Sequence, residues 1–171
     1  MFKGMGAGVL ISLEQYLATD YSPDREFVDG VVLERHVGEL PHSLVQRNLV
    51  LVLCQRYPHL FVLPELRVRT VSGRCRIPDV CVTLERPSTD VLEDAPFLAI
   101  EILSRRDEMT EVLEKLEEYV EAGVANVWLV DPRKKRIYTF TAHRLEEVLD
   151  SQAVTEPPHI RLELDEVFRG L

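Results

Sequence analysis

Two acidic residues stand out because each lies in or beside an apolar, strand-like segment. Asp79 follows Pro78 at the start of PDVCVTL, and Glu101 lies inside the apolar run FLAIEIL. If these segments are neighbouring antiparallel strands whose connection is centred near residue 90, residues 79 and 101 fall nearly opposite each other. The alternation of side chains then puts both carboxylates on one face, with Cβ atoms about 4.5–5.5 Å apart.

Two carboxylates placed in this way repel each other unless a hard cation lies between them. Mg²⁺ is held by one or two carboxylates while it keeps several waters for a substrate phosphate, so the pair predicts a Mg²⁺ site at which Mn²⁺ can substitute. Other interpretations stay open. An acid after a proline is also typical of a turn or a sheet edge, and Glu101 is either ion-paired, metal-bound or at a solvated edge, because burying it alone is costly.

Short-range signals indicate the elements that must position these acids. Residues 12–15 (SLEQ) have the form of a capping box and predict a short helix. Asp29-Gly30 and Ser72-Gly73 lie between apolar runs and predict two hairpins, the second flanked by LRVRTV and RCRIPDVCVTL. Between residues 41 and 57 apolar residues recur at helical spacing, which predicts a second helix.

The rest of the chain continues this alternation. FLAIEIL (97–103) reads as a strand, and residues 107–122 form the clearest helix, ended by Gly123. Its seven acidic residues are expected mostly to face solvent, and its buried stripe is expected to comprise Met109, Leu113, Leu116 and Val120. VANVWLVD and RIYTFTA are strands joined by a turn at Asp131-Pro132, residues 151–159 a loop, and RLELDEVF a strand or short helix.

These elements predict an α/β fold with a mixed β-sheet, flanking helices and β-hairpins. The 171 residues are 46% hydrophobic, enough to bury the core of one domain, which we place at residues 12–171 after an N-terminal extension of residues 1–11. The extension is too short and too polar for a signal peptide, and no apolar stretch of 18 residues follows. We therefore expect no membrane association and a cytoplasmic location.

Charge and cysteine content narrow the function classes. A net charge of −9 argues against a histone-like nucleic-acid coat, although it leaves room for a local basic groove. The three cysteines, Cys54, Cys75 and Cys81, have no C-x-x-C spacing, so they favour neither a disulfide scaffold nor a cysteine zinc site.

Four segments, REFVDG, RIPDVCVTL, FLAIEILS and KLEEYVEAGVANVWLVDP, resemble the Uma-type family of restriction-endonuclease-like proteins, which belongs to the PD-(D/E)xK nuclease superfamily. The resemblance runs from about residue 12 to residue 168. It implies a restriction-endonuclease-like core with a Mg²⁺ site, DNA as the substrate and a homodimer. By this resemblance Asp79 is similar to the Pro-Asp acid of the superfamily and Glu101 to its second acid.

The sequence departs from the superfamily at the lysine expected two residues after the glutamate, where Leu103 stands. Lys115, in the following helix, matches the lysine that takes over in the family. Lys115 lies with Val112 and Tyr119 on a strip beside the buried stripe, from which its stem can be buried and its ammonium directed at the end of the sheet. The alternative is a surface salt bridge from Glu111 to Lys115, worth about 0.3–0.5 kcal/mol.

Two further residues match the family. Glu26 is similar to a glutamate before the Asp-Gly turn, which implies a third ligand or an anchor for an activating water; an exposed acid at a strand start is the alternative. His42, at the start of the second helix, stands where the family often has a histidine. A histidine at such a place is more often a cap or a surface residue than a catalytic one.

Basic residues cluster near the two acids. Arg74 and Arg76 precede Asp79, and Arg105 and Arg106 follow Glu101, which predicts a nucleic-acid-binding rim that positions phosphates. Arginines at strand ends are also a common way of keeping sheet edges soluble.

The sequence thus predicts a Mg²⁺-dependent endonuclease that hydrolyses phosphodiester bonds of DNA. Asp79 and Glu101 bind the metal, Lys115 orients the water or stabilises developing charge, and Glu26 assists. Two alternatives remain: a non-catalytic interaction or regulatory protein on the same fold, and a carboxylate-pair hydrolase such as a glycosidase, which needs no metal.

Overall fold

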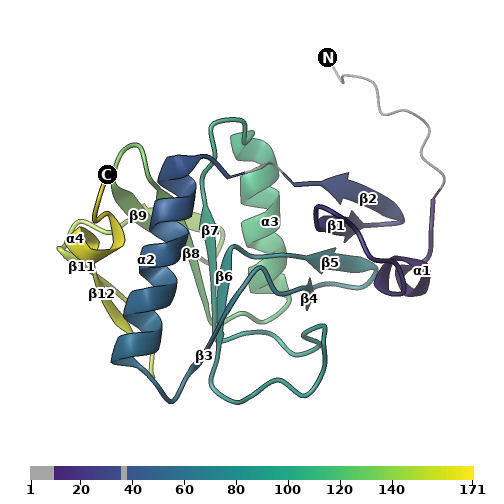
Figure 1. The fold of residues 1–171 in the computed structure, drawn as a ribbon, viewed down its shortest axis with the longest axis horizontal. Coiled ribbons are helices and arrows are strands. Elements are labelled where there is room, and N and C mark those ends of the chain that lie inside the picture. The colour runs from purple at the N-terminus through teal and green to yellow at the C-terminus, as the bar shows by residue number, and fades with distance from the viewer. Residues whose placement is uncertain (1–9, 36–37) are drawn as a thin grey trace.

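The computed structural model describes residues 10–35 and 38–171, which form a large six-stranded β-sheet, a small four-stranded β-sheet and a two-stranded sheet near the C-terminus (Figure 1). Most of the expected N-terminal extension, residues 1–9, lies outside the described residues. The large sheet has the strand order β10 (Arg144–Glu147), β9 (Arg136–Thr141), β8 (Asn126–Asp131), β7 (Leu98–Ile102), β6 (Val80–Thr83), β3 (Phe61–Pro64).

The large sheet is mixed because one helix connects two of its central strands. β6 pairs antiparallel with β3 and with β7, whereas β7 pairs parallel with β8. Helix α3 (Met109–Glu121) makes the crossover between β7 and β8, since parallel strands cannot be joined by a tight turn. The predicted α/β class with a mixed sheet is confirmed.

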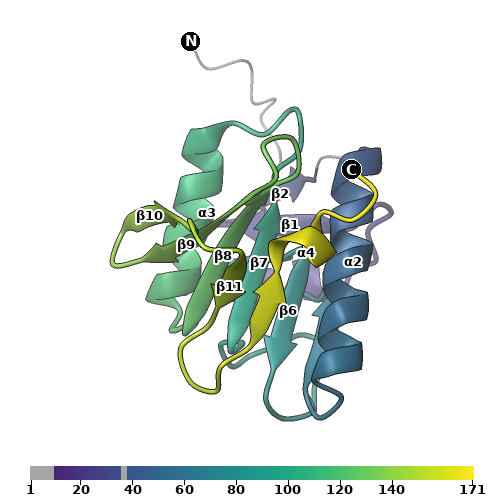
Figure 2. The same ribbon diagram turned by 90° about the vertical axis from the view of Figure 1, so that its left-hand side faces the viewer.

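Alternation along β6 and β7 divides the core between the two faces of this sheet. Val80, Ile100 and their neighbours in register pack with helix α2 (Leu40–Arg56) in one hydrophobic cluster. Ala99 packs with α3 in another cluster. The two helices therefore cover opposite faces of the sheet (Figure 2). Because side chains alternate along β7, Glu101 shares the face of Ala99, opposite to that of Ile100, and points toward α3.

The small sheet is antiparallel, and both hairpins expected from the sequence lie in it. Its order is β2 (Val31–Glu34), β1 (Arg25–Val28), β5 (Arg74–Arg76), β4 (Val68–Arg69). Asp29 and Gly30 have φ angles of 48° and 91°, the two positive values that a type I′ turn requires. Helix α1 (Leu13–Leu17) carries the predicted capping box between Ser12 and Gln15 and packs on this sheet through Tyr16.

The second arm of the Ser72-Gly73 hairpin does not continue as one strand. β5 ends at Arg76 and β6 begins at Val80, and the two strands belong to different sheets. Pro78 lies in the break, where its missing N–H removes one ladder hydrogen bond. Asp79 is therefore at the junction of the two sheets.

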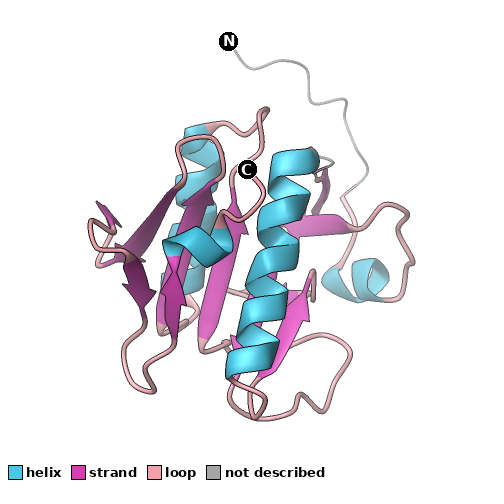
Figure 3. Ribbon diagram, turned by 60° about the vertical axis from the view of Figure 1, so that its left-hand side comes forward, coloured by secondary structure: helices cyan, strands magenta, loops and turns pink. Residues whose placement is uncertain are grey.

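The structure corrects several local expectations. β3 was not expected, and β11 (Gln152–Val154) forms inside the segment predicted to be a loop. RLELDEVF contains both a strand, β12 (Arg161–Glu163), and a short helix, α4 (Leu164–Val167). This C-terminal part lies beside α2 (Figure 3), where Asn48 Nδ2 donates to the carbonyl oxygen of Val167 at 3.0 Å.

The buried face of α3 also differs from the predicted stripe. Met109 is 47% exposed, whereas Leu116 and Tyr119 are fully buried, so the centre of the face is displaced toward Tyr119. Gly123, with φ of 92°, ends the helix as predicted. No helix in the described part of the chain combines the length and the apolar character needed to cross a membrane.

Candidate active site

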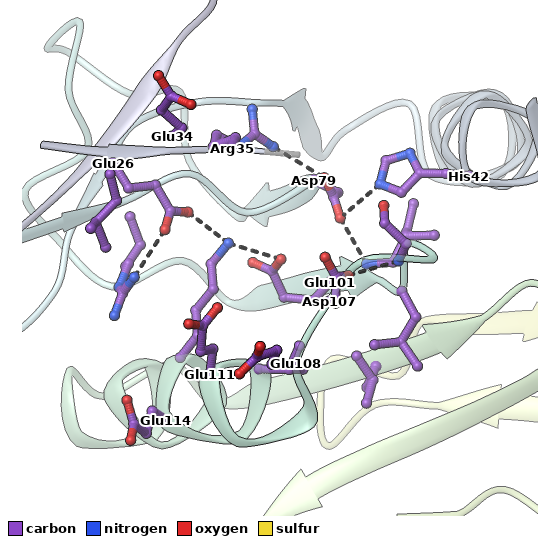
Figure 4. A pocket seen from close by; sticks show the side chains of 18 of the residues that line it. Glu26, Glu34, Arg35, His42, Asp79, Glu101, Asp107, Glu108, Glu111 and Glu114 are labelled. Atoms are coloured by element: carbon purple, nitrogen blue, oxygen red, sulfur yellow. Dashed lines mark hydrogen bonds and ion pairs between the residues drawn. The ribbon is translucent and has the colours of Figure 1, made fainter. Parts of the chain in front are cut away.

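The strand register brings Asp79 and Glu101 together as the sequence predicts. Val80 pairs with Ile100 across β6 and β7, and Asp79 and Glu101 are the next opposed positions. Both acids are buried, and both line a pocket of about 430 Å³ between the end of the large sheet, α3 and the small sheet (Figure 4). The alternatives of an exposed turn or sheet-edge position for Asp79 and of a solvated edge for Glu101 do not hold.

The carboxylate of Asp79 is held by donors from three parts of the chain. Oδ2 accepts from the backbone N–H of Ile102 at 2.7 Å and lies 3.2 Å from His42 Nε2, and Oδ1 accepts from Arg35 Nη2 at 3.1 Å. Burial alone would raise the pKa of Asp79, but the hydrogen bond and charge of His42, with the charge of Lys115, lower it below its ordinary value. Asp79 is therefore an anion in the folded protein.

Glu101 is held by two groups of α3. Tyr119 Oη donates to Oε1 at 2.7 Å, and Lys115 Nζ donates to Oε2 at 2.9 Å. Burial raises the pKa of Glu101 to about 7, the ammonium of Lys115 opposes that rise, and the carboxylates of Asp79 and Glu26 add to it. The two opposed acids thus differ in character: Asp79 is ionised, and Glu101 changes its protonation near neutral pH.

Lys115 reaches the acids from α3 as the resemblance implied. Its Nζ lies 2.6 Å from Glu26 Oε1, 2.9 Å from Glu101 Oε2 and 3.4 Å from the carbonyl oxygen of Ile77. These three acceptors match the three N–H donors of an ammonium. Lys115 pairs with glutamates of two other elements, and the alternative of a surface salt bridge to Glu111 of its own helix does not appear among the ion pairs of the described residues.

Glu26, on β1, is 6% exposed, so the interpretation as an exposed strand-start acid is wrong. Its Oε1 accepts from Lys115 and from the backbone N–H of Ile77 at 3.1 Å, and its Oε2 accepts from Arg76 Nη1 at 2.9 Å. Burial acts to raise the pKa of Glu26, but the charges of Lys115 and Arg76 outweigh it and lower the pKa to about 2. Glu26 is a permanent anion that holds Lys115.

Sequence reasoning missed two residues of this site, Arg35 and Tyr119, left His42 open, and misplaced Glu118, which lies beside it. Arg35 follows β2, and no spacing in the sequence links it to Asp79, 44 residues away. Tyr119 was placed beside the buried stripe, but its hydroxyl on Glu101 was not foreseen. His42 is neither a cap nor a surface residue; it is 8% exposed and faces Asp79. Glu118 was counted among the solvent-facing acids and is 3% exposed.

A comparison with protein families gives a match that spans nearly the whole chain. Residues 13–168, which include every residue of the pocket, match the family Uma2, described as "Putative restriction endonuclease". The chain belongs to the Uma2 family.

Among solved structures, the chain is similar to the crystal structure of "a putative nuclease belonging to DUF820 from Anabaena variabilis ATCC 29413". The TM-score is 0.77 at 22% identity, over 92% of this chain and 97% of that one, so the two share a fold. A fit to the cryo-EM structure of the DrdV–DNA complex has a TM-score of 0.35 at 12% identity, over 73% of this chain and 12% of that one, and carries no weight. No curated protein matches the chain at a significant level.

The predicted basic rim of this Uma2 protein divides into two pairs. Arg105 and Arg106 are exposed in the loop after β7. Arg76 is 8% exposed and engaged by Glu26 and Glu118, and Arg74 pairs with Asp29 and Glu118. Arg74 and Arg76 therefore hold protein carboxylates, whereas Arg105 and Arg106 face solvent.

The donor set of the Uma2 site fits a hard cation that keeps part of its water shell. Carboxylate oxygens are the ligands that Mg²⁺ and Mn²⁺ prefer. Asp79 Oδ1 and both oxygens of Glu101 each accept one hydrogen bond from the described residues and keep a second lone pair, whereas Asp79 Oδ2 has two partners. Within residues 10–35 and 38–171, no three His, Cys, Asp or Glu side chains form a group able to hold a metal. A cation here would be held by the carboxylates of Asp79 and Glu101 and would complete its coordination with water or substrate.

The pocket as a whole attracts cations. Its charged lining comprises eight acids (Glu26, Glu34, Asp79, Glu101, Asp107, Glu108, Glu111 and Glu114) and the three basic residues Arg35, Arg76 and Lys115, in addition to His42. Acids of α3 and β2 form its rim (Figure 4). This excess of negative charge concentrates divalent cations at the mouth of the pocket.

Proposed function

We propose that this Uma2 protein is an endonuclease that hydrolyses phosphodiester bonds of DNA with Mg²⁺ as its cofactor and Mn²⁺ as a substitute. The observation that carries the proposal is the placement of Asp79 and Glu101 at opposed positions of β6 and β7, with the Lys115 ammonium bound to Glu101 in the same pocket. The description of the family agrees with a nuclease.

Asp79 and Glu101 would hold the ion, which when bound polarises a phosphate oxygen and lowers the pKa of its water. Asp79 is suited to this task because it is already ionised and fixed by three donors. Glu101 has a raised pKa, so it must give up its proton before it can act as a ligand.

Lys115 supplies the fixed positive charge of the mechanism. Its ammonium lies within hydrogen-bond distance of Glu101, so it is positioned to orient a water or to stabilise the charge that develops on phosphate oxygens. The carboxylates around it keep it protonated, since burial acts to lower the pKa of Lys115 but the charges of Glu101 and Glu26 outweigh that effect and hold the pKa above its ordinary value. Glu26 acts through Lys115 and not as a third ligand.

Contact with the DNA backbone falls to basic groups at the edge of the site. Arg35 lines the pocket next to Asp79, and Arg105 and Arg106 are exposed in the loop that follows β7. These residues give sequence-independent phosphate contacts, which position the duplex without selecting bases. The acidic rim makes the approach of a polyanion unfavourable until cations have neutralised it, so binding of DNA is expected to depend on divalent ions.

A cleavage assay tests the proposal. Supercoiled, linear duplex and single-stranded DNA are incubated with the protein in Mg²⁺, Mn²⁺ or EDTA. We expect cleavage with either metal, none in EDTA and none with Glu101→Gln. Glu121→Gln is the matched control, because Glu121 is an exposed glutamate of the same helix outside the pocket.

The other outcomes separate the alternatives. Absence of cleavage together with absence of Mg²⁺ binding in calorimetry would establish a non-catalytic interaction protein. Hydrolysis of a glycoside in EDTA would establish a carboxylate-pair hydrolase that needs no metal. Either result overturns the nuclease proposal.

We further propose that the protein acts as a homodimer, since two sites related by a twofold axis can each address one strand of a duplex. Light scattering at tens of micromolar protein should give about twice the chain mass of 19.6 kDa. A mass equal to one chain under these conditions would exclude the dimer.

A further inference from the structure

Buried ion pairs fasten the small sheet to helix α3. Arg76, on β5, donates from Nε to Glu118 Oε2 at 2.8 Å, from Nη2 to Glu118 Oε1 and from Nη1 to Glu26 Oε2 at 2.9 Å. Glu118 and Glu26 are 3% and 6% exposed, and Arg76 is 8% exposed. One guanidinium therefore joins a glutamate of α3 to a glutamate of β1, out of contact with bulk water.

The mechanism proposed above makes no use of Glu118. It does not line the pocket, and it has no contact with Asp79 or Glu101 among its hydrogen bonds and ion pairs to other described residues. It is, however, three residues after Lys115 on α3, so both side chains extend from the same helix face toward the small sheet. Arg76 and Glu26 connect the two residues through space.

We propose that Glu118 and Arg76 are positioning residues: Glu118 fixes the Arg76 guanidinium, Arg76 fixes the carboxylate of Glu26, and Glu26 sets the ammonium of Lys115 against Glu101. The significance of Lys115 rests on the function proposed above, but the chain of contacts does not. In this proposal the small sheet, through Arg76 and Glu26, holds the ammonium of Lys115 in place.

The physical need for such a support follows from the nature of lysine. Its ammonium is a point charge on a flexible four-carbon stem, so nothing in the side chain itself selects one position. The guanidinium of Arg76 is bound by both oxygens of Glu118, which fixes its plane. Its Nη1 is therefore held in a defined position, from which it donates to Glu26 Oε2. The Arg76–Glu118 pair therefore fixes, through Glu26, the position of the Lys115 ammonium, which the lysine side chain alone does not fix.

Stability is a poor alternative explanation for these contacts. The cost of removing two charges from water offsets much of the attraction within a buried ion pair, so such pairs contribute little net stability compared with apolar packing. An apolar contact between β5 and α3 would hold the sheet as well, but it would leave Glu26 Oε2 without the donor that fixes the plane of this carboxylate, so that only Oε1 would be held, by Lys115 and the N–H of Ile77. The defined geometry at Glu26 is what the charged contact adds.

Magnetic resonance of the lysine ammonium groups tests this inference directly. The chain has four lysines, Lys3, Lys115, Lys134 and Lys135, so lysine labelled with ¹⁵N at Nζ gives a spectrum of few signals. Lys115→Arg assigns the signal of Lys115, which we expect to exchange slowly with water at a single chosen pH because the group is buried and bound. In full-length Glu118→Gln we expect this signal to shift and its exchange to become about tenfold faster.

Glu93→Gln is the matched control, because it removes an ion pair of the same small sheet that is exposed and unconnected to Lys115, namely the pair with Arg69 at 3.2 Å. We expect the Lys115 signal of this variant to match the parent. A folded Glu118→Gln protein with an unchanged Lys115 signal would overturn the inference, even if its melting temperature were lower. If Glu118→Gln fails to fold, Glu118→Asp, which keeps the charge but shortens the reach, is judged by the same signal and the same criterion.

Cleavage measurements provide a second readout. With saturating metal and a range of DNA concentrations, Glu118→Gln should lower kcat about 10- to 100-fold and leave KM unchanged, since Glu118 does not line the pocket and acts only through Lys115. A protein that cleaves no DNA in any form overturns the proposed function but leaves the resonance test intact. The two failures are therefore distinguishable.

Discussion

The carboxylate of Asp79 accepts a hydrogen bond from the backbone N–H of Ile102 at 2.7 Å, one residue beyond Glu101. This contact joins the junction of the two sheets to the end of β7. Asp79 therefore has a structural task as well as its proposed role as a metal ligand, whereas the partners of the Glu101 carboxylate among the described residues are side chains of α3. The two acids of the pair should respond differently to substitution.

Asp79→Ala should destabilise the fold by roughly 2–4 kcal/mol in EDTA, because it leaves the N–H of Ile102 and the guanidinium of Arg35 without their buried partner. Glu101→Gln keeps the shape of its side chain and removes a carboxylate with a raised pKa, so it should cost less than 1 kcal/mol or stabilise. Urea unfolding of both variants measures the difference. Equal losses would show that Asp79 has no special structural role.

Both substitutions should abolish the binding of Mg²⁺ in spite of their different effects on stability. Each removes one of the two carboxylates that are proposed to hold the ion, so that a single one of them would remain. Calorimetric titration with Mg²⁺ at pH 8 measures binding. If either Glu101→Gln or a folded Asp79→Asn protein binds Mg²⁺ as tightly as the parent, the metal site lies elsewhere.

Stability in EDTA should fall as the pH rises from 5 to 8. The folded protein binds the Glu101 proton more tightly than the unfolded chain does, so the stability from this group is complete below pH 4.5 and is lost as the pH rises through about 7. The shift corresponds to roughly 3 kcal/mol. His42, with a raised pKa, acts in the same direction, and the difference between parent and Glu101→Gln isolates the part due to Glu101. Parallel curves for the two proteins would contradict this assignment.

The relation of Asp79 to Glu101 was predictable because it depends on local rules. Period-two alternation in two recognisable strands, with a connection centred near residue 90, fixes which residues oppose each other, and the observed pairing of Val80 with Ile100 follows that pattern. The capping box at Ser12 and the turn at Asp29-Gly30 were predictable for the same reason, since both depend on neighbouring residues. The position of Lys115 came from the family resemblance.

The rest of the site depends on contacts between distant segments, for which the sequence carries no local signal. Glu118 was expected to face solvent because glutamates on helices usually do. Its burial is explained by Arg76, 42 residues earlier, and by Arg74, both on β5 of the small sheet. Arg35 reaches Asp79 only after the small sheet has packed beside β6. β3 escaped notice because FVLP is short and ends in proline, so it resembles a loop until its pairing with β6 is known.

Arg105→Gln combined with Arg106→Gln should weaken DNA binding equally for all sequences and leave stability within about 0.5 kcal/mol, because both side chains are exposed. The slope of log Kd against log salt should fall by about 2. Fluorescence anisotropy in Ca²⁺ over a range of KCl measures the slope. The control is Arg86→Gln, an exposed arginine in the connection between β6 and β7, at the opposite end of the strands from Asp79 and Glu101. An unchanged slope in the double variant would remove the loop after β7 from the DNA interface.

Lys115→Ala should reduce single-turnover cleavage by about 10²–10³-fold, because it removes a fixed positive charge from the site of the reaction. The affinity for Mg²⁺ should not decrease, since an ammonium bound to Glu101 Oε2 competes with a metal for that carboxylate. Calorimetry and cleavage under saturating metal separate the two effects. Full activity in Lys115→Ala would leave this residue a purely structural role.

Placing a lysine at position 103 tests in a second way whether the site needs a positive charge beside Glu101. Leu103 shares the face of Glu101 by alternation, lines the pocket and packs beside α3. The combination of Leu103→Lys with Lys115→Ala therefore returns an ammonium to the pocket from the strand, and it should recover part of the activity that Lys115→Ala loses. Stability should fall modestly, because an apolar contact with α3 is replaced by a charged side chain. Recovery in the double variant, with none in Leu103→Met combined with Lys115→Ala, would establish that the site requires a positive charge beside Glu101 and accepts it from either element.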